Sequence, residues 1–412
     1  DFVVACNSKE YKEGFAIALL TVNDIWNPNK EEEAQQIYET TDIYHPGVNI
    51  LLNETHSIYV GGSIEGIHNP KHYDYPQLRH TPVELRKIFH EKGWSDIIAF
   101  QTRNPMHRAH VELTKKALKE KNAKLLIHPV VGLTKPGDVN HYTRVRCYNN
   151  IMKKYPKDMA ELSLLPLAMR MAGPKEALWH AIIRKNYGCN YFIIGRDHAS
   201  PGFNKDNKPF YGPYDAQEML NEHSNELGIN MIPFKQLVYV KEKKSFMGID
   251  EVPKDSTTLS VSGTELRNLL DQGKEIPEWF SYPEVVRELQ KQRPSLSKRG
   301  FTIFFTGLSG SGKSTLANGL LVKLLEDGHR PVSLLDGDIV RTHLSSELGF
   351  SKEHRSLNVR RIGFVASEIT KNGGIAICAP IAPYRLDRQF NRDMIDPLGG
   401  YIEIFVNTPL EI

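Results

Sequence analysis

The stretch FTIFFTGLSGSGKSTLANGLL (Phe301–Leu321) decides the fold of the C-terminal part of this chain. Its segment Gly307–Thr315 satisfies the pattern G-x-x-x-x-G-K-[ST], between an apolar run and a helical stretch (Leu316–Leu325). This order predicts a phosphate-binding loop, in which Lys313 reaches the β- and γ-phosphates and the Ser314 hydroxyl binds Mg²⁺. The alternative is a glycine-rich turn without a ligand. The predicted phosphate-binding residues are Gly307, Leu308, Ser309, Gly310, Ser311, Gly312, Lys313, Ser314 and Thr315.

Carboxylates and cations follow this loop along the chain. VSLLDGDIVR (Val332–Arg341) places Asp336 and Asp338 after an apolar run, where a carboxylate can hold Mg²⁺ or accept a hydroxyl proton. We therefore predict that Ser314 and Asp336 bind Mg²⁺ together with a nucleotide. The stretch 348–361 then adds an aromatic ring and donors suited to an anionic nucleotide. These residues are Phe350, Arg355, Asn358, Arg360 and Arg361.

A second polar constellation lies in AFQTRNPMHRAH (Ala99–His110), after the strand-like run SDIIAF. Pro105 stands where a helix would begin, and His107 and His110, three residues apart, share one face of its first turn. Backbone donors and the positive end of the helix dipole lie at the same place, which favours binding of a triphosphate. A metal half-site and ordinary surface histidines are the alternatives.

Two further loops carry donors toward the same region. FIIGRDHASPG (Phe192–Gly202) ends a strand-like run with Arg196 and His198, and the carboxyl ends of parallel strands face one crevice. VSGTELR supplies Ser262, Thr264 and Arg267 at a predicted helix start. The segment after the second strand adds Lys135, Arg144 and Arg146, and for Arg144 and Arg146 plain surface charge is an equal alternative.

The chain as a whole divides into five predicted regions. Short β-type runs fill residues 1–81, and apolar runs alternate with helical stretches over 82–235, which predicts a parallel α/β sheet. The strand candidates there are SDIIAF, AKLLIHPVV, LSLLPLA and YFIIGR. Residues 236–292 form a third region, 293–300 a polar linker, and 301–412 a second α/β domain.

Composition narrows the class of protein. With 40% hydrophobic and 25% charged residues and a net charge of +3, the chain has the composition of a globular protein without a nucleic-acid footprint. It has no apolar run of the roughly 20 residues that span a bilayer. Its four cysteines, Cys6, Cys147, Cys189 and Cys378, form no C-x-x-C pair, which favours a reducing, cytoplasmic location. A targeting segment before Asp1 stays open.

The motifs resemble those of two enzyme families. QTRNPMHRAH and GRDHASPG match the ATP sulfurylase signatures, except that Ser200 replaces a glycine, and the resemblance extends over about residues 10–292. The P-loop region, with APYRLDR (Ala382–Arg388), resembles adenylylsulfate (APS) kinase. The resemblance implies an α/β protein with a PUA-like β-rich N-terminal remnant, a Rossmann-like HxxH nucleotidyltransferase domain and a P-loop kinase domain, truncated at both ends.

The sulfurylase resemblance implies roles for the first constellation. Sulfate is an unprotonated dianion, so its attack on the α-phosphorus of ATP needs donors that hold two anions in line rather than a general base. Gln101, Arg103 and Arg196 would hold sulfate, His107 and His110 the β- and γ-phosphates, and Asn104 the α-phosphate. The implied substrate-binding set is Gln101, Thr102, Arg103, Asn104, His107, His110, Gly195, Arg196, Asp197, His198, Ala199, Ser262, Thr264 and Arg267.

The kinase resemblance implies that Asp338 is the base, which joins Arg103, Asn104, His107, His110 and Arg196 as catalytic residues. The implied APS-binding residues are Asp336, Asp338, Arg341, Phe350, Arg355 and Asn358. The sequence departs from the kinase pattern at Ile339, Leu357 and Ala382, and it ends at Ile412, before the segment with which the family closes over its substrates. We therefore expect nucleotide binding more readily than phosphoryl transfer.

The implied function is sulfate activation: ATP and sulfate give APS and pyrophosphate, and APS and ATP give 3′-phospho-APS (PAPS) and ADP. The alternatives are a P-loop domain that only regulates, a sulfurylase working in the ATP-forming direction, and another histidine-motif nucleotidyltransferase. We expect Mg²⁺ with ATP and no organic prosthetic group. The expected partners are ATP, sulfate and APS, with no nucleic acid or membrane, in a homo-oligomer of two or six chains.

Overall fold

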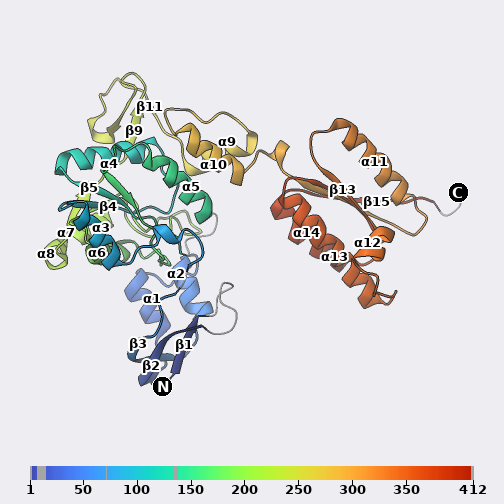
Figure 1. Ribbon diagram of the computed structural model, residues 1–412, viewed down its shortest axis with the longest axis horizontal. Helices are drawn as coiled ribbons and strands as arrows, with labels where there is room; N and C mark the ends of the chain where they lie inside the picture. The colour runs from blue at the N-terminus through green and yellow to red at the C-terminus, as the bar shows by residue number, and fades with distance from the viewer. Residues whose placement is uncertain (1, 7–14, 71, 133–137, 410–412) are drawn as a thin grey trace. The chain divides into compact units, whose positions relative to one another are not determined.

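The computed structural model describes residues 2–6, 15–70, 72–132 and 138–409 (Figure 1). The chain forms two compact units. The first comprises Asp1–Val261 with Pro277–Leu289, and the second comprises Ser262–Ile276 with Gln290–Ile412. No helix among the described residues is both long and apolar enough to cross a bilayer.

The N-terminal region contains an antiparallel sheet in the order β1-β2-β3, with β1 (Phe2–Cys6), β2 (Phe15–Trp26) and β3 (Tyr59–Gly66). Helices α1 (Lys30–Tyr38) and α2 (Pro46–Asn49) and the π-helical turn η1 (Ile50–Glu54) lie between β2 and β3. They pack around a small core that also includes Ala172. This region is β-rich, as the sequence predicts.

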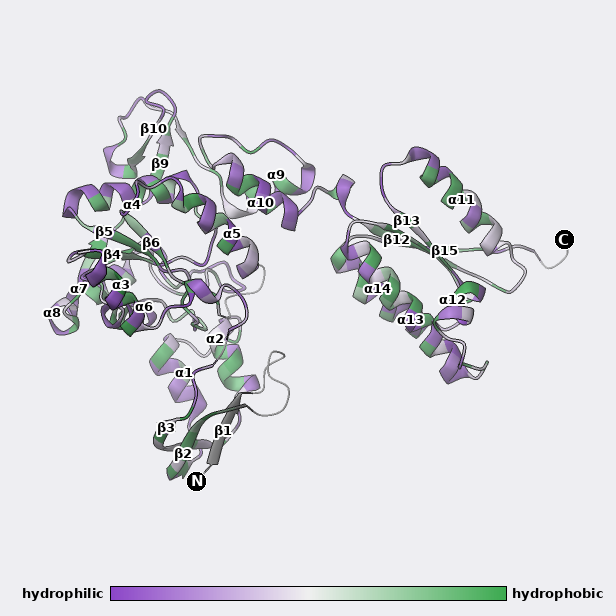
Figure 2. Cartoon of the chain, in the orientation of Figure 1, coloured by the Kyte–Doolittle hydropathy of each residue, from purple (hydrophilic) through white to green (hydrophobic). Residues whose placement is uncertain are grey.

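The centre of the first unit is a five-stranded parallel sheet in the order β6-β5-β4-β7-β8. Its strands are β4 (Ile97–Phe100), β5 (Lys124–Ile127), β6 (Ala160–Leu162), β7 (Tyr191–Ile194) and β8 (Asn230–Pro233). Its helices are α3 (Pro82–Glu91), α4 (Arg108–Lys121), α5 (His141–Met152), α6 (Gly173–Asn186), α7 (Asp215–Glu222) and α8 (Ser224–Leu227). The predicted parallel α/β sheet is confirmed, and Figure 2 shows the contrast between its apolar strands and helices of mixed hydropathy.

The strand predicted over LSLLPLA is shifted toward the N-terminus. Strand β6 ends at Leu162, and only an isolated parallel bridge from Val130 to Leu165 continues the pairing. Pro166 follows, and it has no N–H to donate to a ladder.

The order of the sheet fixes where a ligand can bind. The chain adds β5 and then β6 on one side of β4, whereas β7 and then β8 are added on the opposite side of β4. The strand order therefore reverses between β4 and β7, and ligands of open α/β sheets bind in the crevice at such a point. The loops after β4 and β7 are those that carry the predicted site residues.

Residues 236–292 add a small antiparallel sheet, β10-β9-β11, with β9 (Leu237–Val240), β10 (Ser245–Gly248), the 3-10 turn η3 (Ile249–Glu251) and β11 (Thr258–Leu259). Helices α9 (Gly263–Gln272) and α10 (Pro283–Gln292) follow. Helix α9 groups with the second unit, and Arg293 and Arg299 of the sequence-predicted linker both pair with Asp271 of α9.

The C-terminal sheet is parallel, in the order β13-β14-β12-β15. Its strands are β12 (Phe301–Thr306), β13 (Val332–Asp336), β14 (Ile375–Ala379) and β15 (Tyr401–Phe405). Its helices are α11 (Lys313–Asp327), α12 (Gly337–His343), α13 (Lys352–Lys371) and α14 (Arg385–Ile395), with 3-10 turns η4 (Leu296–Lys298) and η5 (Asp396–Leu398). Because side chains alternate along a strand, Ile303 and Phe305 join one core and Phe304 joins the other.

Candidate functional site

A cavity of about 360 Å³ opens beside the carboxyl ends of β4 and β7. Both predicted loops contribute to its walls, so the structure brings the two sequence motifs together. The predicted residues that line it are Gln101, Thr102, Arg103, Asn104, His110, Gly195, Arg196, Asp197, His198 and Ala199. We call it the sheet cavity.

Two guanidinium groups face this cavity, and each has a partner that limits its movement. Arg103 Nη1 lies 3.1 Å from Asp138 Oδ2, and both side chains are largely buried. Arg196 donates through Nη1 to Gln236 Oε1 at 2.8 Å and lies 3.2 Å from the Asp197 carboxylate, with its side chain about half exposed. Two positive charges in one cavity, each held at a fixed place, suit a dianion.

His107 and His110 stand at the start of α4 in a hydrogen-bonded arrangement. The backbone N–H of His107 donates to His110 Nδ1, and His107 Nδ1 lies 2.8 Å from Ser281 Oγ. Since His110 Nδ1 accepts a bond, a neutral ring carries its proton on Nε2 and can donate there. Burial lowers the pKa of His107 to about 3 and that of His110 to about 4. Both rings are therefore neutral near pH 7.

Only His110 of this pair lines the sheet cavity; His107 packs against Phe280. Among the described residues, no group of three or more His, Cys, Asp or Glu side chains is arranged to hold a metal ion.

The loop after β7 has an unusual backbone. Asp197 and Ala199 both have φ near +54°, a region that non-glycine residues seldom occupy. Two bonds hold it there: Asp197 N–H donates to Pro213 O, and Ala199 O accepts from Gly173 N–H. The sequence departure at Ser200 fits within this loop, because its hydroxyl accepts from Gly202 N–H.

The three other residues predicted for this site, Ser262, Thr264 and Arg267, lie at the start of α9. Ser262 caps the helix by accepting from Glu265 N–H, and Arg267 donates to Thr264 Oγ1. They belong to the second unit and are not among the described residues that line the sheet cavity.

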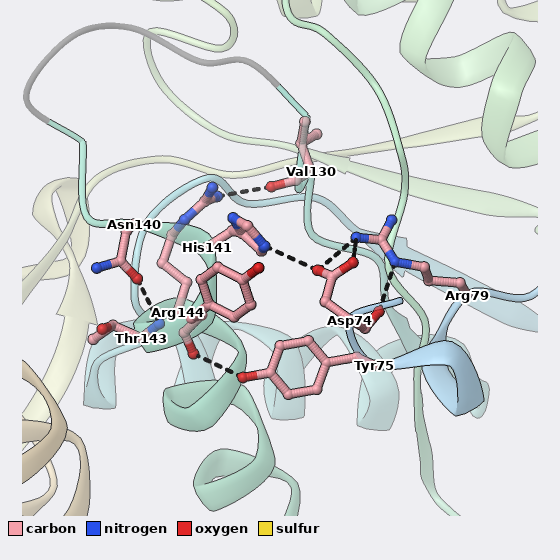
Figure 3. Close-up of polar contacts among 9 residues, drawn as sticks. Asp74, Tyr75, Arg79, Val130, Asn140, His141, Thr143 and Arg144 are labelled. Atoms are coloured by element: carbon pink, nitrogen blue, oxygen red, sulfur yellow. Dashed lines mark hydrogen bonds and ion pairs between the residues drawn. The ribbon is translucent and has the colours of Figure 1, made fainter. Parts of the chain in front are cut away.

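Three of the predicted cations come from the segment between β5 and β6. Lys135 lies outside the described residues. Arg144 is 2% exposed and donates to Val130 O at 2.7 Å (Figure 3), so its reading as a plain surface charge is wrong. Arg146 is about half exposed and pairs with Glu288.

A buried carboxylate lies close to Arg144. Asp74 accepts from both Arg79 and His141, at 2.8 and 2.9 Å (Figure 3). Burial opposes its ionisation, but the bonds from Arg79 and His141 outweigh this and lower the pKa of Asp74. This ion pair ties the segment before α3 to the start of α5.

Several residues of the sheet cavity were missed by the sequence reasoning. The segment from Phe234 to Leu237 lines the cavity, and Asp138 holds Arg103. The segment from Phe234 to Leu237 could have been predicted from the sequence, because it follows β8, the parallel strand next to β7, and so lies at the same edge of the sheet. The role of Asp138 had no local signal.

A second cavity, of about 470 Å³, lies at the carboxyl ends of β12, β13 and β14, and we call it the P-loop cavity. Gly307 and Gly312 of the loop have φ of 149° and 88°, and a Cβ on Gly307 would meet Val406 O at 2.6 Å. The loop thus requires glycine where the pattern has it. The predicted residues that line the cavity are Ser309, Gly310, Lys313, Ser314, Asp336, Asp338, Arg341, Phe350, Arg355 and Asn358.

Polar atoms at the head of α11 are arranged for a phosphate and a cation. Lys313 is buried and donates to Leu308 O at 2.6 Å, and burial lowers its pKa, partly offset by Asp336. Ser314 Oγ donates to Asp336 Oδ2 at 2.7 Å, and Asp338 N–H donates to Asp336 Oδ1. A hydroxyl and a carboxylate oxygen side by side are ligands that suit Mg²⁺.

The far wall of the P-loop cavity combines an aromatic ring with cations. The Arg341 guanidinium lies 4.5 Å from the centre of the Phe350 ring, which is itself 72% exposed. Arg355 donates to Phe350 O, and the Asn358 side chain is buried with Oδ1 unpartnered in the described part of the chain. An exposed ring and an open acceptor are features suited to a nucleoside.

Three family descriptions match this chain. Residues 76–292 match ATP-sulfurylase, residues 299–412 match adenylylsulphate kinase, and residues 8–69 match a PUA-like domain. These matches cover the parts of the chain that hold the sheet cavity, the P-loop cavity, and strands β2 and β3 of the N-terminal sheet, respectively.

Whole proteins with similar sequences are described as sulfate adenylyltransferases. A sulfate adenylyltransferase of Gibberella zeae is 51% identical over 98% of this chain and 70% of its own length. One from Phaeosphaeria nodorum is 53% identical over 96% of this chain and 69% of its own length. A solved structure described as a hexameric APS kinase from Thiobacillus denitrificans has a TM-score of 0.77 and 41% identity, covering 97% of this chain and 73% of that one.

Proposed function

This chain belongs to the ATP-sulfurylase family and carries an APS kinase domain after the sulfurylase domain, and we propose how its two cavities perform the two reactions. The sheet cavity joins ATP to sulfate and releases pyrophosphate. The P-loop cavity transfers a phosphate from ATP to the 3′-hydroxyl of the APS that the first reaction makes. The observation that carries the assignment of the sheet cavity is that Arg103 and Arg196 both face it, each held by its own partner, Asp138 and Gln236.

In the sheet cavity, Arg103 and Arg196 hold sulfate together with the Gln101 amide. Both ATP and sulfate are anions that repel one another, so the reaction needs positive charge and fixed geometry more than it needs a base. Asp138 and Gln236 keep the two guanidinium groups in place before sulfate arrives. Less reorganisation then accompanies binding.

The start of α4 holds the leaving group. His110 donates from Nε2 to the β- or γ-phosphate as a neutral ring, and His107 supports it through its backbone N–H. Asn104 contacts the α-phosphate, where the new bond forms. The helix N-terminus adds partial positive charge as pyrophosphate departs. The remaining loop residues, including Thr102 and Gly195, shape the cavity around the nucleotide.

In the P-loop cavity, Lys313 and the loop N–H groups hold the phosphates, and Asp338 accepts the proton of the attacking hydroxyl. Ser314 and Asp336 hold Mg²⁺, which neutralises charge on the phosphates. Arg341, Phe350, Arg355 and Asn358 bind APS.

In the same proposal the protein assembles into a homo-oligomer, as the hexameric relative suggests. It resides in the cytoplasm, which free buried cysteines such as Cys147 and Cys189 support.

The test measures phosphate release from MgATP in the presence of inorganic pyrophosphatase, with and without sulfate. We expect sulfate-dependent release, and we expect Arg103→Ala to lower it about 100-fold or more. Arg287→Ala is the matched control, since Arg287 is exposed on α10 outside the cavity. Release that is equal with and without sulfate in a folded protein would refute the assignment of the sheet cavity.

A further inference from the structure

The loop after β4 contains a carbonyl oxygen that two hydroxyl groups share. Asn104 O accepts from Tyr148 Oη at 2.9 Å and from Thr102 Oγ1 at 2.9 Å. A carbonyl oxygen only accepts, so both hydroxyls are donors in these contacts, and together they occupy its two lone pairs. Thr102 Oγ1 in turn accepts from Asn104 N–H at 3.0 Å. The two hydroxyl groups therefore fix the turn from Thr102 to Asn104.

The residue after Asn104 makes this carbonyl important for the shape of the loop. Because Pro105 has no N–H, the peptide that joins Asn104 to Pro105 can be hydrogen-bonded only through the Asn104 carbonyl. Tyr148 reaches this carbonyl from α5, and its side chain is fully buried. A buried hydroxyl without a partner would destabilise the fold, so the tyrosine and the carbonyl hold each other in place.

A second carbonyl of the same loop is also connected to α5. Val130 N–H donates to Thr102 O at 3.1 Å, and Val130 O accepts from Arg144 at 2.7 Å (Figure 3). Arg144 and Tyr148 are four residues apart, so they lie on one face of α5. Helix α5 therefore holds the loop at two places, directly at Asn104 and through Val130 at Thr102.

Arg103 stands between these two places. The peptide before it is held through Thr102 O, and the peptide after it donates its N–H to Thr102 Oγ1. Its side chain lines the sheet cavity and pairs with Asp138. Contacts at residues 102 and 104 thus hold the backbone of Arg103, while the Asp138 carboxylate holds its guanidinium end.

We propose that the Tyr148 hydroxyl, together with that of Thr102, positions Arg103 for sulfate by holding the Asn104 carbonyl. Tyr148 is not among the described residues that line the sheet cavity, so it acts through the loop and not by contact with a substrate. It is a positioning residue. The proposal rests on the proposed function, which assigns sulfate to Arg103.

The reaction makes the position of this guanidinium critical. Sulfate must meet the α-phosphorus of ATP in line, and a small displacement of a group that holds a reactant lowers the rate steeply. A small rotation of the backbone is enlarged at the end of a long side chain such as that of Arg103. Once sulfate shares the guanidinium with Asp138, the hold on the backbone keeps Arg103 in place.

The first test is Tyr148→Phe, which removes one oxygen atom and keeps the buried ring. The Asn104 carbonyl then loses one of its two donors, and the loop can rotate. We expect kcat/KM for sulfate, measured at saturating MgATP as sulfate-dependent phosphate release with pyrophosphatase, to fall about tenfold. An unchanged value in a folded variant would overturn the proposal.

Tyr155→Phe is the matched control. Tyr155 is also a buried tyrosine, and its hydroxyl lies 2.6 Å from Thr114 Oγ1, away from the described lining of the sheet cavity. Each variant loses one buried hydrogen bond, so the two should lower the Tm by similar amounts. Only Tyr148→Phe should lower kcat/KM for sulfate. Equal activities of the two variants would show that the hydroxyl of Tyr148 contributes only to stability.

A double-mutant cycle tests whether Tyr148 acts through Arg103. When Arg103 is absent, the loop has no guanidinium left to misplace. We therefore expect the effect of Tyr148→Phe to shrink from about tenfold in the wild-type background to less than about twofold in Arg103→Ala. A tenfold loss in both backgrounds would contradict the proposed route.

Hydrogen–deuterium exchange of the full chain without substrates reports on the loop directly. The N–H of Asn104 donates to Thr102 Oγ1, and that hydroxyl is oriented by the carbonyl that Tyr148 holds. We expect the peptide that contains Asn104 to exchange about fivefold faster in Tyr148→Phe than in the wild type or in Tyr155→Phe. Equal exchange in all three proteins would overturn the role of Tyr148.

A second pair of variants applies if Tyr148→Phe does not fold, which circular dichroism would show. Thr102→Val lacks the hydroxyl that donates to Asn104 O, whereas Thr102→Ser keeps it. We expect kcat/KM for sulfate to be about tenfold lower in the valine variant than in the serine variant. Equal values would overturn the proposal from the loop side.

Failure of this proposal is distinguishable from failure of the proposed function. If wild-type release depends on sulfate but Tyr148→Phe behaves like Tyr155→Phe, the proposal alone fails. If wild-type release is the same with and without sulfate, the proposed function fails, and hydrogen exchange still decides whether Tyr148 holds the loop.

Discussion

The guanidinium of Arg103 and the carboxylate of Asp138 lie 3.1 Å apart, and the two come from segments on either side of β5. In the proposed function, sulfate binds to the same Arg103 guanidinium that the Asp138 carboxylate already pairs with. Asp138 therefore both positions Arg103 and competes with the substrate for it.

This relationship predicts a particular response of Asp138→Asn. Removing one partner of a largely buried ion pair leaves the other uncompensated, so we expect a lower Tm in the absence of anions. Sulfate can replace the lost charge, so added sulfate should raise the Tm of the variant more than that of the wild type. Differential scanning fluorimetry over a sulfate series measures both. The exposed Asp206→Asn is the control, and equal sulfate shifts in the two variants would contradict this reading.

The buried histidines predict how stability depends on pH. The folded pKa of His107 is about 3 and that of His110 about 4, below the value of 6.5 in an unfolded chain. Between these values the unfolded state binds more protons, so stability is complete above pH 6.5 and falls as pH falls toward 4. At pH 5.5 each ring should lower the free energy of unfolding by about 1.4 kcal/mol relative to pH 7.5.

Denaturant unfolding at several pH values, followed by tryptophan fluorescence, measures this slope. All four tryptophans lie in the first unit, so the signal reports on the unit that contains these rings. We expect His107→Asn to reduce the loss of unfolding free energy between pH 7.5 and pH 5.5 by about 1.4 kcal/mol, the contribution of one ring. His223→Asn, at an exposed position, should leave this loss unchanged.

The P-loop cavity predicts a separation of the two activities. Lys313→Ala removes the buried ammonium group at the phosphate site, and we expect PAPS formation from added APS to drop about 100-fold or more. Sulfate-dependent pyrophosphate release should stay within about twofold, since Lys313 lies in the other unit. Lys323→Ala, on the exposed side of α11, is the control. If the wild-type chain makes no PAPS but its sulfurylase responds to PAPS through Lys313, the domain regulates.

Two arginines that look alike in the sequence should differ in stability. Arg144→Leu leaves the buried Val130 carbonyl without its donor (Figure 3), which should lower the free energy of unfolding by about 1–3 kcal/mol. Arg146→Leu removes the partner of the largely buried Glu288 carboxylate, but the Arg146 side chain itself is 42% exposed, so we expect a smaller loss than for Arg144→Leu. Denaturant titration of both variants makes the comparison, and equal losses would show that burial of Arg144 does not govern its contribution.

Much of the fold could be predicted because its signals are local. The apolar runs before Gln101 and Gly195 are buried strands, and the pattern at Gly307–Thr315 specifies a strand, a loop and a helix. A parallel sheet then places loops from distant parts of the sequence at one edge. This is why the residues of each motif meet in a cavity.

The rest of the site depends on contacts without a local pattern. Asp138 reaches Arg103 across 35 positions, and the segment from Phe234 to Leu237 lines the sheet cavity from another strand end. The helix start at Ser262 groups with the second compact unit, which its sequence does not indicate. Arg144 illustrates the same limit, since an arginine in an amphipathic helix gives no indication that it is buried.

The backbone of Asp197 and Ala199 has a consequence for how the sheet cavity meets its substrates. Glycine at either position would relieve the unfavourable φ, yet it would also let the unbound loop sample many shapes. With aspartate and alanine held in place by Pro213 and Gly173, the loop has its binding shape in advance. In the proposed function, the conformational entropy that a flexible loop would lose on contact with ATP is already lost during folding, and more of the contact energy remains for affinity.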